Sequence, residues 1–266
     1  MSELRRRLQQ GEVVLGQMIL ELFTPGIAPM LAACGLEFVI FDMEHGRCDI
    51  ATVAEMIASC RGSNIVPLVR VPDLNFAPLS RVLDLGAQGV MVPRVESRTQ
   101  AEEIVGQLKY APQGRRGVAL GIAHDRYQAG GAEFFEKANE ENLVIVLLET
   151  QKAFDNLETI VSVPGIDIAW MGHYDLTVSM GIPTQFEHPR FLECMEALAV
   201  TCRRFGVAPG FLPPNPTSAI HWISKGFRAI SLGSDIAVYM TALKSFRQEV
   251  ASTIPRPTPE VKDRDR

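Results

Sequence analysis

The sequence alternates short apolar runs, rich in β-branched residues, with longer amphipathic segments, and this alternation restricts the folds open to the chain. We expect strands at residues 13–19, 37–42, 65–71, 89–92, 143–149, 166–171, 207–212 and 229–232. We expect helices at residues 50–61, 77–85, 97–108, 152–161, 190–205, 217–225 and 236–251. Several strands are apolar almost throughout, as strands covered on both faces of a parallel sheet are. About eight strand-then-helix units predict a (β/α)₈ TIM barrel.

A doubly wound open sheet is the competing topology. A sheet of that kind that bound a dinucleotide would carry a glycine-rich phosphate loop after its first strand. The residues there read ELFTPG and contain no such loop. The barrel is therefore favoured.

The chain is predicted to form one barrel domain over residues 1–253. The remaining residues, 254–266, combine three prolines with dense charge and are expected to form a loosely ordered tail. Residues 110–131 interrupt the strand-helix rhythm, and a stretch of this length without clear secondary structure is often functional. We expect it to cover a site or a neighbouring subunit.

Composition excludes several classes of protein. The net charge is −5 and no long basic run is present, so nucleic acid is not an expected partner. The apolar runs are far shorter than the ~20 residues that span a bilayer. The amino terminus lacks the apolar core of a secretory signal, and the five cysteines form no CxxC pair. We therefore expect no membrane partner and a location in the reducing cytoplasm.

Catalytic groups of a parallel barrel lie at the carboxyl ends of the strands. The second strand runs into Asp42, Glu44 and His45, a set suited to acid–base chemistry, although these side chains could instead satisfy backbone groups of a loop. The third strand ends in Arg70, which could grip a carboxylate through two hydrogen bonds or form a surface salt bridge. Asp84 lies near a helix end, where most aspartates are solvated.

The fifth strand ends in Glu149, and the sixth leads through Gly172, His173 and Tyr174 to Asp175. Two carboxylates on adjacent strand ends, completed by water and substrate oxygens, are a usual way to hold Mg²⁺ or Mn²⁺. Asp175 could equally be a helix N-cap.

The segments FDMEHG, PLVRV, VLDLGAQGVMVPRVES and LLETQKAFDNLETIVSVPGIDIAWMGHYDLTVSMG, taken together, resemble the HpcH/HpaI aldolases, the metal-dependent class II pyruvate aldolases related to 4-hydroxy-2-oxoheptanedioate aldolase. The resemblance extends over about residues 15–236. It implies a (β/α)₈ barrel of the phosphoenolpyruvate/pyruvate-binding type. It also implies homo-oligomers, in which subunits pair by exchanging a terminal helix and three such dimers commonly form a hexamer.

The resemblance assigns the divalent-metal ligands to Glu149 and Asp175, with Mg²⁺, Mn²⁺ or Co²⁺ as the cation. The metal would polarise the carbonyl of a pyruvate-like donor, and Arg70 would steady the negative charge that develops on its oxygen. The resemblance assigns proton transfer through metal-bound water to His45, and orientation of that histidine to Asp84.

The remaining carried-over residues surround this centre. Asp42 matches a member of the polar network. The substrate-binding set comprises Arg70, Gly172, His173, Tyr174 (through its backbone N–H), Asp175 and, at the acceptor pocket, Leu212.

The resemblance implies an aldehyde-lyase that reversibly cleaves a 4-hydroxy-2-oxo acid into pyruvate, or hydroxypyruvate, and an aldehyde through an enolate. No predicted central strand ends in lysine, which agrees with metal rather than Schiff-base chemistry. An enolate-forming lyase or synthase of the citrate-synthase or acyl-CoA lyase type is the alternative enzyme, and a 2-oxo acid sensor is the non-enzyme alternative.

Two positions depart from the family pattern. Leu147 stands where many members have glutamine, so one polar contact near the donor is lost. His173 stands where relatives often have proline, and we expect it to add a titratable donor beside the metal.

Overall fold

The computed structural model describes residues 2–75 and 79–254. Eight parallel strands close into a barrel in the order β1 to β8, each pairing with its sequence neighbours and β8 pairing with β1. The strands are β1 (Val14–Ile19), β2 (Phe38–Asp42), β3 (Val66–Arg70), β4 (Gly89–Val92), β5 (Leu143–Leu148), β6 (Ile168–Met171), β7 (Ala208–Phe211) and β8 (Ala229–Ser234). The predicted (β/α)₈ barrel is confirmed.

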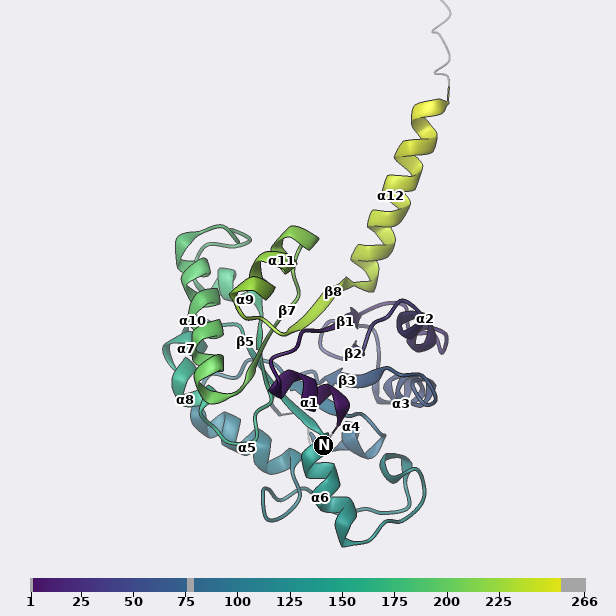
Figure 1. Ribbon diagram of the computed structural model, residues 1–266, viewed down its shortest axis with the longest axis vertical. Coiled ribbons are helices and arrows are strands. Elements are labelled where there is room, and N and C mark those ends of the chain that lie inside the picture. Colours follow the sequence, from purple (N-terminus) through teal and green to yellow (C-terminus); the bar gives the residue numbers. More distant parts are fainter. Residues whose placement is uncertain (1, 76–78, 255–266) are drawn as a thin grey trace, which may run out of the picture.

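Helices surround the barrel (Figure 1). They are α1 (Glu3–Gln9), α2 (Ile27–Ala33), α3 (Ile50–Ser59), α4 (Arg81–Asp84), α5 (Arg98–Leu108), the 3₁₀ turn η1 (Ala123–Asp125), α6 (Ala132–Glu141), α7 (Gln151–Asp155), α8 (Leu157–Val161), α9 (His173–Ser179), α10 (Pro189–Phe205), α11 (Pro216–Lys225) and α12 (Asp235–Thr253). The helix predicted over residues 152–161 is wrong in one respect, because it breaks at Asn156 into α7 and α8.

Four helices have no counterpart among the sequence predictions, namely α1, α2, α6 and α9. The predicted helix 77–85 falls partly outside the described residues, and its described part contains α4. The tail expected at residues 254–266 lies outside them except for residue 254. Residues 110–131 contain no regular element other than η1, as predicted.

The barrel interior is filled by alternating large and small residues. Phe38 and Trp170 meet edge to face, with ring centroids 6.4 Å apart. Gly16 lies against Phe38 and Gly210 against Trp170, and a Cβ atom at either glycine would come within 2.3 Å of the neighbouring ring. Glycine is therefore required at both positions for the rings to fit, and the interior is a packed core rather than a channel.

Helix α1 closes the amino-terminal end of the barrel. Ser2 caps it by accepting a hydrogen bond from the backbone N–H of Arg5. Leu4 and Leu8 lie one turn apart on the same face and pack into the interior cluster. The opposite, carboxyl end of the barrel carries the polar residues that the sequence analysis singles out.

Helix α12 extends away from the barrel at the carboxyl-terminal end of the chain (Figure 1). Its apolar side chains are exposed, and they include Ile236, Val238, Tyr239, Met240, Leu243, Phe246 and Val250. Among the described residues, the helices are too short or too polar to cross a lipid bilayer.

Candidate active site

The candidate site lies at the carboxyl ends of β2, β3, β5 and β6. Successive side chains of a strand alternate between its two faces, so Asp42, Arg70 and Glu149 share the inward face with the core residues two positions before them. Asp42 and Arg70 are direct register partners on neighbouring strands. The predicted grouping of these strand ends is therefore realised in the fold.

Arg70 is held by two carboxylates. Its Nε and Nη2 donate to the two carboxylate oxygens of Asp42 at 2.7 and 2.5 Å, and its Nη1 lies 3.0 Å from Oε2 of Glu44. Asp42 is fully buried and Arg70 is nearly so. A bidentate pair of this kind fixes the plane of the guanidinium group. The salt bridge proposed as an alternative role for Arg70 exists, but it is buried beneath the barrel rim rather than on the surface.

Glu44 belongs to this network. Its position after the second strand grouped it with Asp42 and His45, but the family resemblance assigned it no role. Burial raises the pKa of Glu44 despite the opposing effect of Arg70. Its Oε2 also lies 4.0 Å from Nε2 of His45. The side chain of His45 is 53% exposed, which leaves its ring accessible for proton transfer. The FDMEHG segment, which places two carboxylates and a histidine together, was the available signal for Glu44.

Glu149 is a buried carboxylate with a single hydrogen-bond donor among the described residues. The backbone N–H of Arg94 donates to its Oε1 at 2.8 Å. Burial, followed by the negative charges of Glu44 and Asp175, raises the pKa of Glu149 to about 7. A carboxylate in this situation is stabilised by a cation.

Gly172 makes room for Glu149. A Cβ atom at this position would lie 2.4 Å from Cβ and 2.7 Å from Oε2 of Glu149. Gly172 also precedes α9, so the chain passes the carboxylate and then presents Asp175 in the first turn of that helix. Asp175 is not the helix N-cap, because Gly172 holds that position, and its side chain is 46% exposed.

Arg94 adopts an uncommon backbone conformation beside Glu149. Its φ is 57°, in the left-handed region, which costs a residue with a Cβ about 1–2 kcal/mol. The same conformation directs its N–H toward Glu149, and its Nη2 lies 4.0 Å from Oδ1 of Asp175. No sequence pattern identified Arg94, because it follows β4 by two residues and its position depends on the backbone turn.

The expectation for the side chain of His173 is wrong. Its ring packs among Tyr174, Phe186 and Phe211, with centroids 4.4, 5.1 and 5.4 Å away. Burial lowers its pKa to about 4, so it is neutral near pH 7 and does not add a titratable donor. Its assignment to the substrate-binding set remains a prediction, as do those of Tyr174 and Leu212. Leu147 is buried in the barrel interior.

Asp84 contacts residues of the 110–131 segment. Its Oδ1 accepts a hydrogen bond from Nη2 of Arg116 at 2.6 Å and lies 3.5 Å from Nδ1 of His124. The alternative that it is merely solvated is therefore wrong. Its assigned role in orienting His45 remains a prediction.

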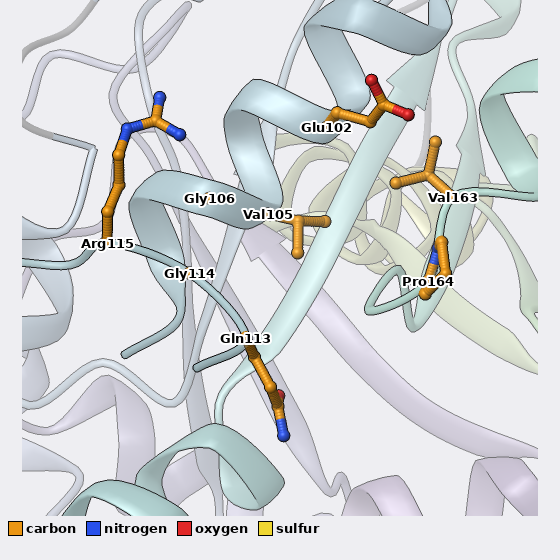
Figure 2. Close-up of a pocket in the computed structure, with 8 residues that line it drawn as sticks. All are labelled: Glu102, Val105, Gly106, Gln113, Gly114, Arg115, Val163 and Pro164. Carbon is orange, nitrogen blue, oxygen red and sulfur yellow. The ribbon is translucent and has the colours of Figure 1, made fainter. Parts of the chain in front are cut away.

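A cavity of about 450 Å³ lies on the flank of the barrel rather than at this rim (Figure 2). The lining of this cavity includes Val105 and Gly106 of α5, together with Arg115 and Val163. It contains none of the residues predicted for the active site, so its size does not make it the catalytic pocket.

The rim residues fit a divalent cation. Within the described parts of the chain, no three His, Cys, Asp or Glu side chains are arranged to hold a metal by themselves. Glu149 and Asp175 would supply two ligands, and substrate and water oxygens would complete the set, as oxygen-preferring divalent cations allow. Burial, together with the negative charges of Glu44 and Asp175, raises the pKa of Glu149 to about 7, and a bound cation would favour its ionised form.

Comparison with known proteins decides the family. The family model for HpcH/HpaI aldolase/citrate lyase matches residues 17–242. The chain belongs to this family. The HpcH/HpaI resemblance predicted from the rim motifs is confirmed, and the chain is a carbon–carbon lyase of the aldolase type.

Relatives cover nearly the whole HpcH/HpaI chain. A 2-keto-3-deoxy-L-rhamnonate aldolase from Salmonella dublin is 30% identical over 238 residues, which are 90% of this chain and 89% of the relative. The crystal structure of an HpcH/HpaI aldolase from Desulfitobacterium hafniense DCB-2 has 29% identity and a TM-score of 0.89, covering 96% of this chain and 98% of the other. A structure titled citrate synthase SbnG has 27% identity and a TM-score of 0.81, with coverage of 93% and 98%.

Proposed function

We propose that the protein cleaves and forms 4-hydroxy-2-oxo acids with the help of a divalent cation, with pyruvate or hydroxypyruvate as the 2-oxo acid. The observation that carries the proposal is the buried Glu149 carboxylate, with its pKa raised to about 7, at the same rim as Arg70 and Asp42. A 2-keto-3-deoxy sugar acid, the substrate class in the name of the Salmonella relative, has this chemistry.

Glu149 and Asp175 are the proposed ligands of the cation, which we take to be Mg²⁺, Mn²⁺ or Co²⁺. When bound, the cation would act as a Lewis acid on the keto group of the substrate. Gly172 leaves the space that Glu149 needs, and the Arg94 N–H fixes one of its oxygens, so the other remains for the cation.

Arg70 supplies positive charge where the substrate oxygen becomes negative. Asp42 engages two of its nitrogens and so prevents rotation of the guanidinium group. Because Asp42 is buried and accepts two hydrogen bonds from Arg70, the guanidinium group is oriented before substrate arrives, and its charge requires little reorganisation during the reaction.

His45 is the proposed proton carrier. In cleavage, the hydroxyl group on C4 loses its proton, the C3–C4 bond breaks, and the aldehyde leaves. The bonding electron pair remains with C3 as an enolate, which takes up a proton to give the 2-oxo acid. The first transfer needs an accessible base and the second needs its protonated form, and the His45 ring is exposed at this rim.

The test is a matrix of Mg²⁺, Mn²⁺ and Co²⁺ against pyruvate or hydroxypyruvate and a panel of aldehydes. We expect aldol product that disappears with EDTA and returns when the metal is restored. If none of these combinations gives product, the proposal is wrong.

A second candidate reaction is condensation of the enolate with an electrophile other than an aldehyde. The similarity of the fold to the citrate synthase structure supports this second candidate. Consumption of oxaloacetate or of a thioester without aldehyde turnover would identify this reaction.

We also propose that α12 packs on a second copy of the chain, and that three such dimers form a hexamer in the cytoplasm. The support is the exposed apolar surface of α12 and its extension away from its own barrel. Light scattering during size-exclusion chromatography would measure the mass, and a monomer would contradict this arrangement.

A further inference from the structure

Arg94 presents a guanidinium group at the rim that the proposed chemistry does not use. Its backbone N–H serves Glu149, but its side chain is 63% exposed and forms no hydrogen bond within the described part of the chain. The one carboxylate paired with it there is Asp175, at 4.0 Å, which is the outer limit of an ion pair. A cation held so loosely is available to another anion.

Arg70 differs from Arg94 in this respect. Its Nε and both terminal nitrogens already face carboxylates of Asp42 and Glu44, and its side chain is 9% exposed. The N–H groups of Arg70 that these contacts leave are assigned in the proposed reaction to the oxygen of the 2-oxo acid, so Arg70 is not available to an anionic group of the second substrate. Lys152, which lies near the same rim on α7, is paired with Glu96 at 3.0 Å.

Metal binding would free Arg94 further. If Asp175 ligated a divalent cation, its charge would no longer be available to Arg94, and the positive charge of the cation would repel the guanidinium group. Four carboxylates, those of Asp42, Glu44, Glu149 and Asp175, then face two guanidinium groups and a divalent cation, so the formal charges of the rim balance. Arg94 is the member of this set that can exchange its partner for a substrate group.

We propose that Arg94 determines acceptor specificity by binding an anionic group, a carboxylate or a phosphate, on the aldehyde. The inference rests on the proposed aldolase function and adds to it the charge of the second substrate. The planar fork of arginine suits both anions. The interior below Glu149 is apolar at Leu147 and Trp170, so the aldehyde finds its polar contacts at the outer edge of the rim.

The experiment compares matched pairs of aldehydes, succinic semialdehyde with butanal and glyceraldehyde 3-phosphate with glyceraldehyde. For each pair, the ratio of kcat/KM for the charged aldehyde to that for the neutral one is measured. We expect Arg94→Met to lower this ratio about 10- to 100-fold in at least one pair, because the loss of a charge-assisted hydrogen bond should raise the KM for the charged aldehyde. The pair that changes identifies the anion as carboxylate or phosphate.

Three further variants separate the effect of the Arg94 side chain from that of its backbone and from that of an unrelated surface arginine. Arg94→Gly keeps the N–H that serves Glu149 and tolerates the positive φ, so it should lower the ratio as much as Arg94→Met does. Arg94→Lys should restore part of it. Arg98→Met is the matched control, because Arg98 is comparably exposed and paired with Glu102 on α5 away from the rim. It should leave the ratio unchanged.

Binding without turnover provides a second measurement. Calorimetry with 4-hydroxybutanoate, the unreactive alcohol that corresponds to succinic semialdehyde, and with glycerol 3-phosphate should show a weaker affinity for Arg94→Met than for the wild type. The role of Arg94 would be overturned if the active Arg94→Met variant kept the wild-type ratios. It would also be overturned if the variant bound each of the two probes as tightly as the wild type does. Absence of any aldol product, with affinities that still differ, would instead overturn the reaction and leave the anion site supported.

Discussion

The two ends of the barrel both bury charge, but they do so in different ways. At the amino-terminal end, Arg5 pairs with Asp167 at 2.6 Å and donates to the carbonyl oxygens of Asn139 and Glu140. Asp167 also accepts from the backbone N–H of Val144, and the Lys109 Nζ donates to two carbonyl oxygens. These groups are supplied with partners from the chain itself.

At the carboxyl end, Glu149 has one backbone donor, Arg94 is loosely paired, and Asp175 and His45 are exposed. A polar group without sufficient partners costs free energy unless a ligand supplies them. The comparison indicates that the first end serves stability and the second serves binding. Substitutions at the two ends should therefore affect different properties.

The largest effect is expected at Glu149. Glu149→Gln should lower kcat by ~10³-fold or more, because it removes a proposed metal ligand and its charge. The same change should not destabilise the metal-free protein at pH 8, where burial disfavours the ionised carboxylate. Steady-state kinetics, metal titration by calorimetry and thermal unfolding measure these properties. Normal turnover or metal affinity in this variant would exclude Glu149 as a ligand.

The matching change at the other end is Lys109→Met. It removes the donor of the Asn142 carbonyl oxygen and one of the two donors of the Asn139 carbonyl oxygen, and should lower the free energy of unfolding by about 1–3 kcal/mol. Denaturant unfolding measures this value. The folded variant should retain wild-type kcat, and a large loss of kcat would contradict the division between the two ends.

The smallest predicted effect concerns pH. The pKa of Glu149 in the folded, metal-free protein is raised to about 7, so the metal must compete with a proton below that pH. Affinity should be nearly constant above pH 8 and should fall about tenfold between pH 8 and pH 6. The stability of the metal-free protein should change in the opposite direction. Because the pKa of Glu149 is higher in the folded than in the unfolded protein, this group lowers the free energy of unfolding as the pH rises from 4.5 to 7. Calorimetric titrations at several pH values test the first trend, and pH-independent affinity would contradict it.

The barrel and most of the residues at its rim could be predicted from the sequence. Strand and helix periods are local properties of the chain, and closure of eight parallel strands brings their carboxyl ends to one edge. Asp42, Arg70 and Glu149 could therefore be selected from their positions at strand ends, before any contact was known. The short helices α1 and α9 were missed because each has only seven residues, too few to show a clear period.

The partners of the rim side chains, by contrast, follow from contacts that form only when the chain folds. His173 follows a strand end just as Glu149 does, yet its ring turns into an aromatic cluster and stays neutral. Arg94 joins the site through a left-handed backbone turn, and Asp84 is engaged by Arg116 and His124 from a distant segment. The physical reason is that hydrogen bonds and pKa values depend on which groups meet across the fold, and these groups lie tens of residues apart in the chain.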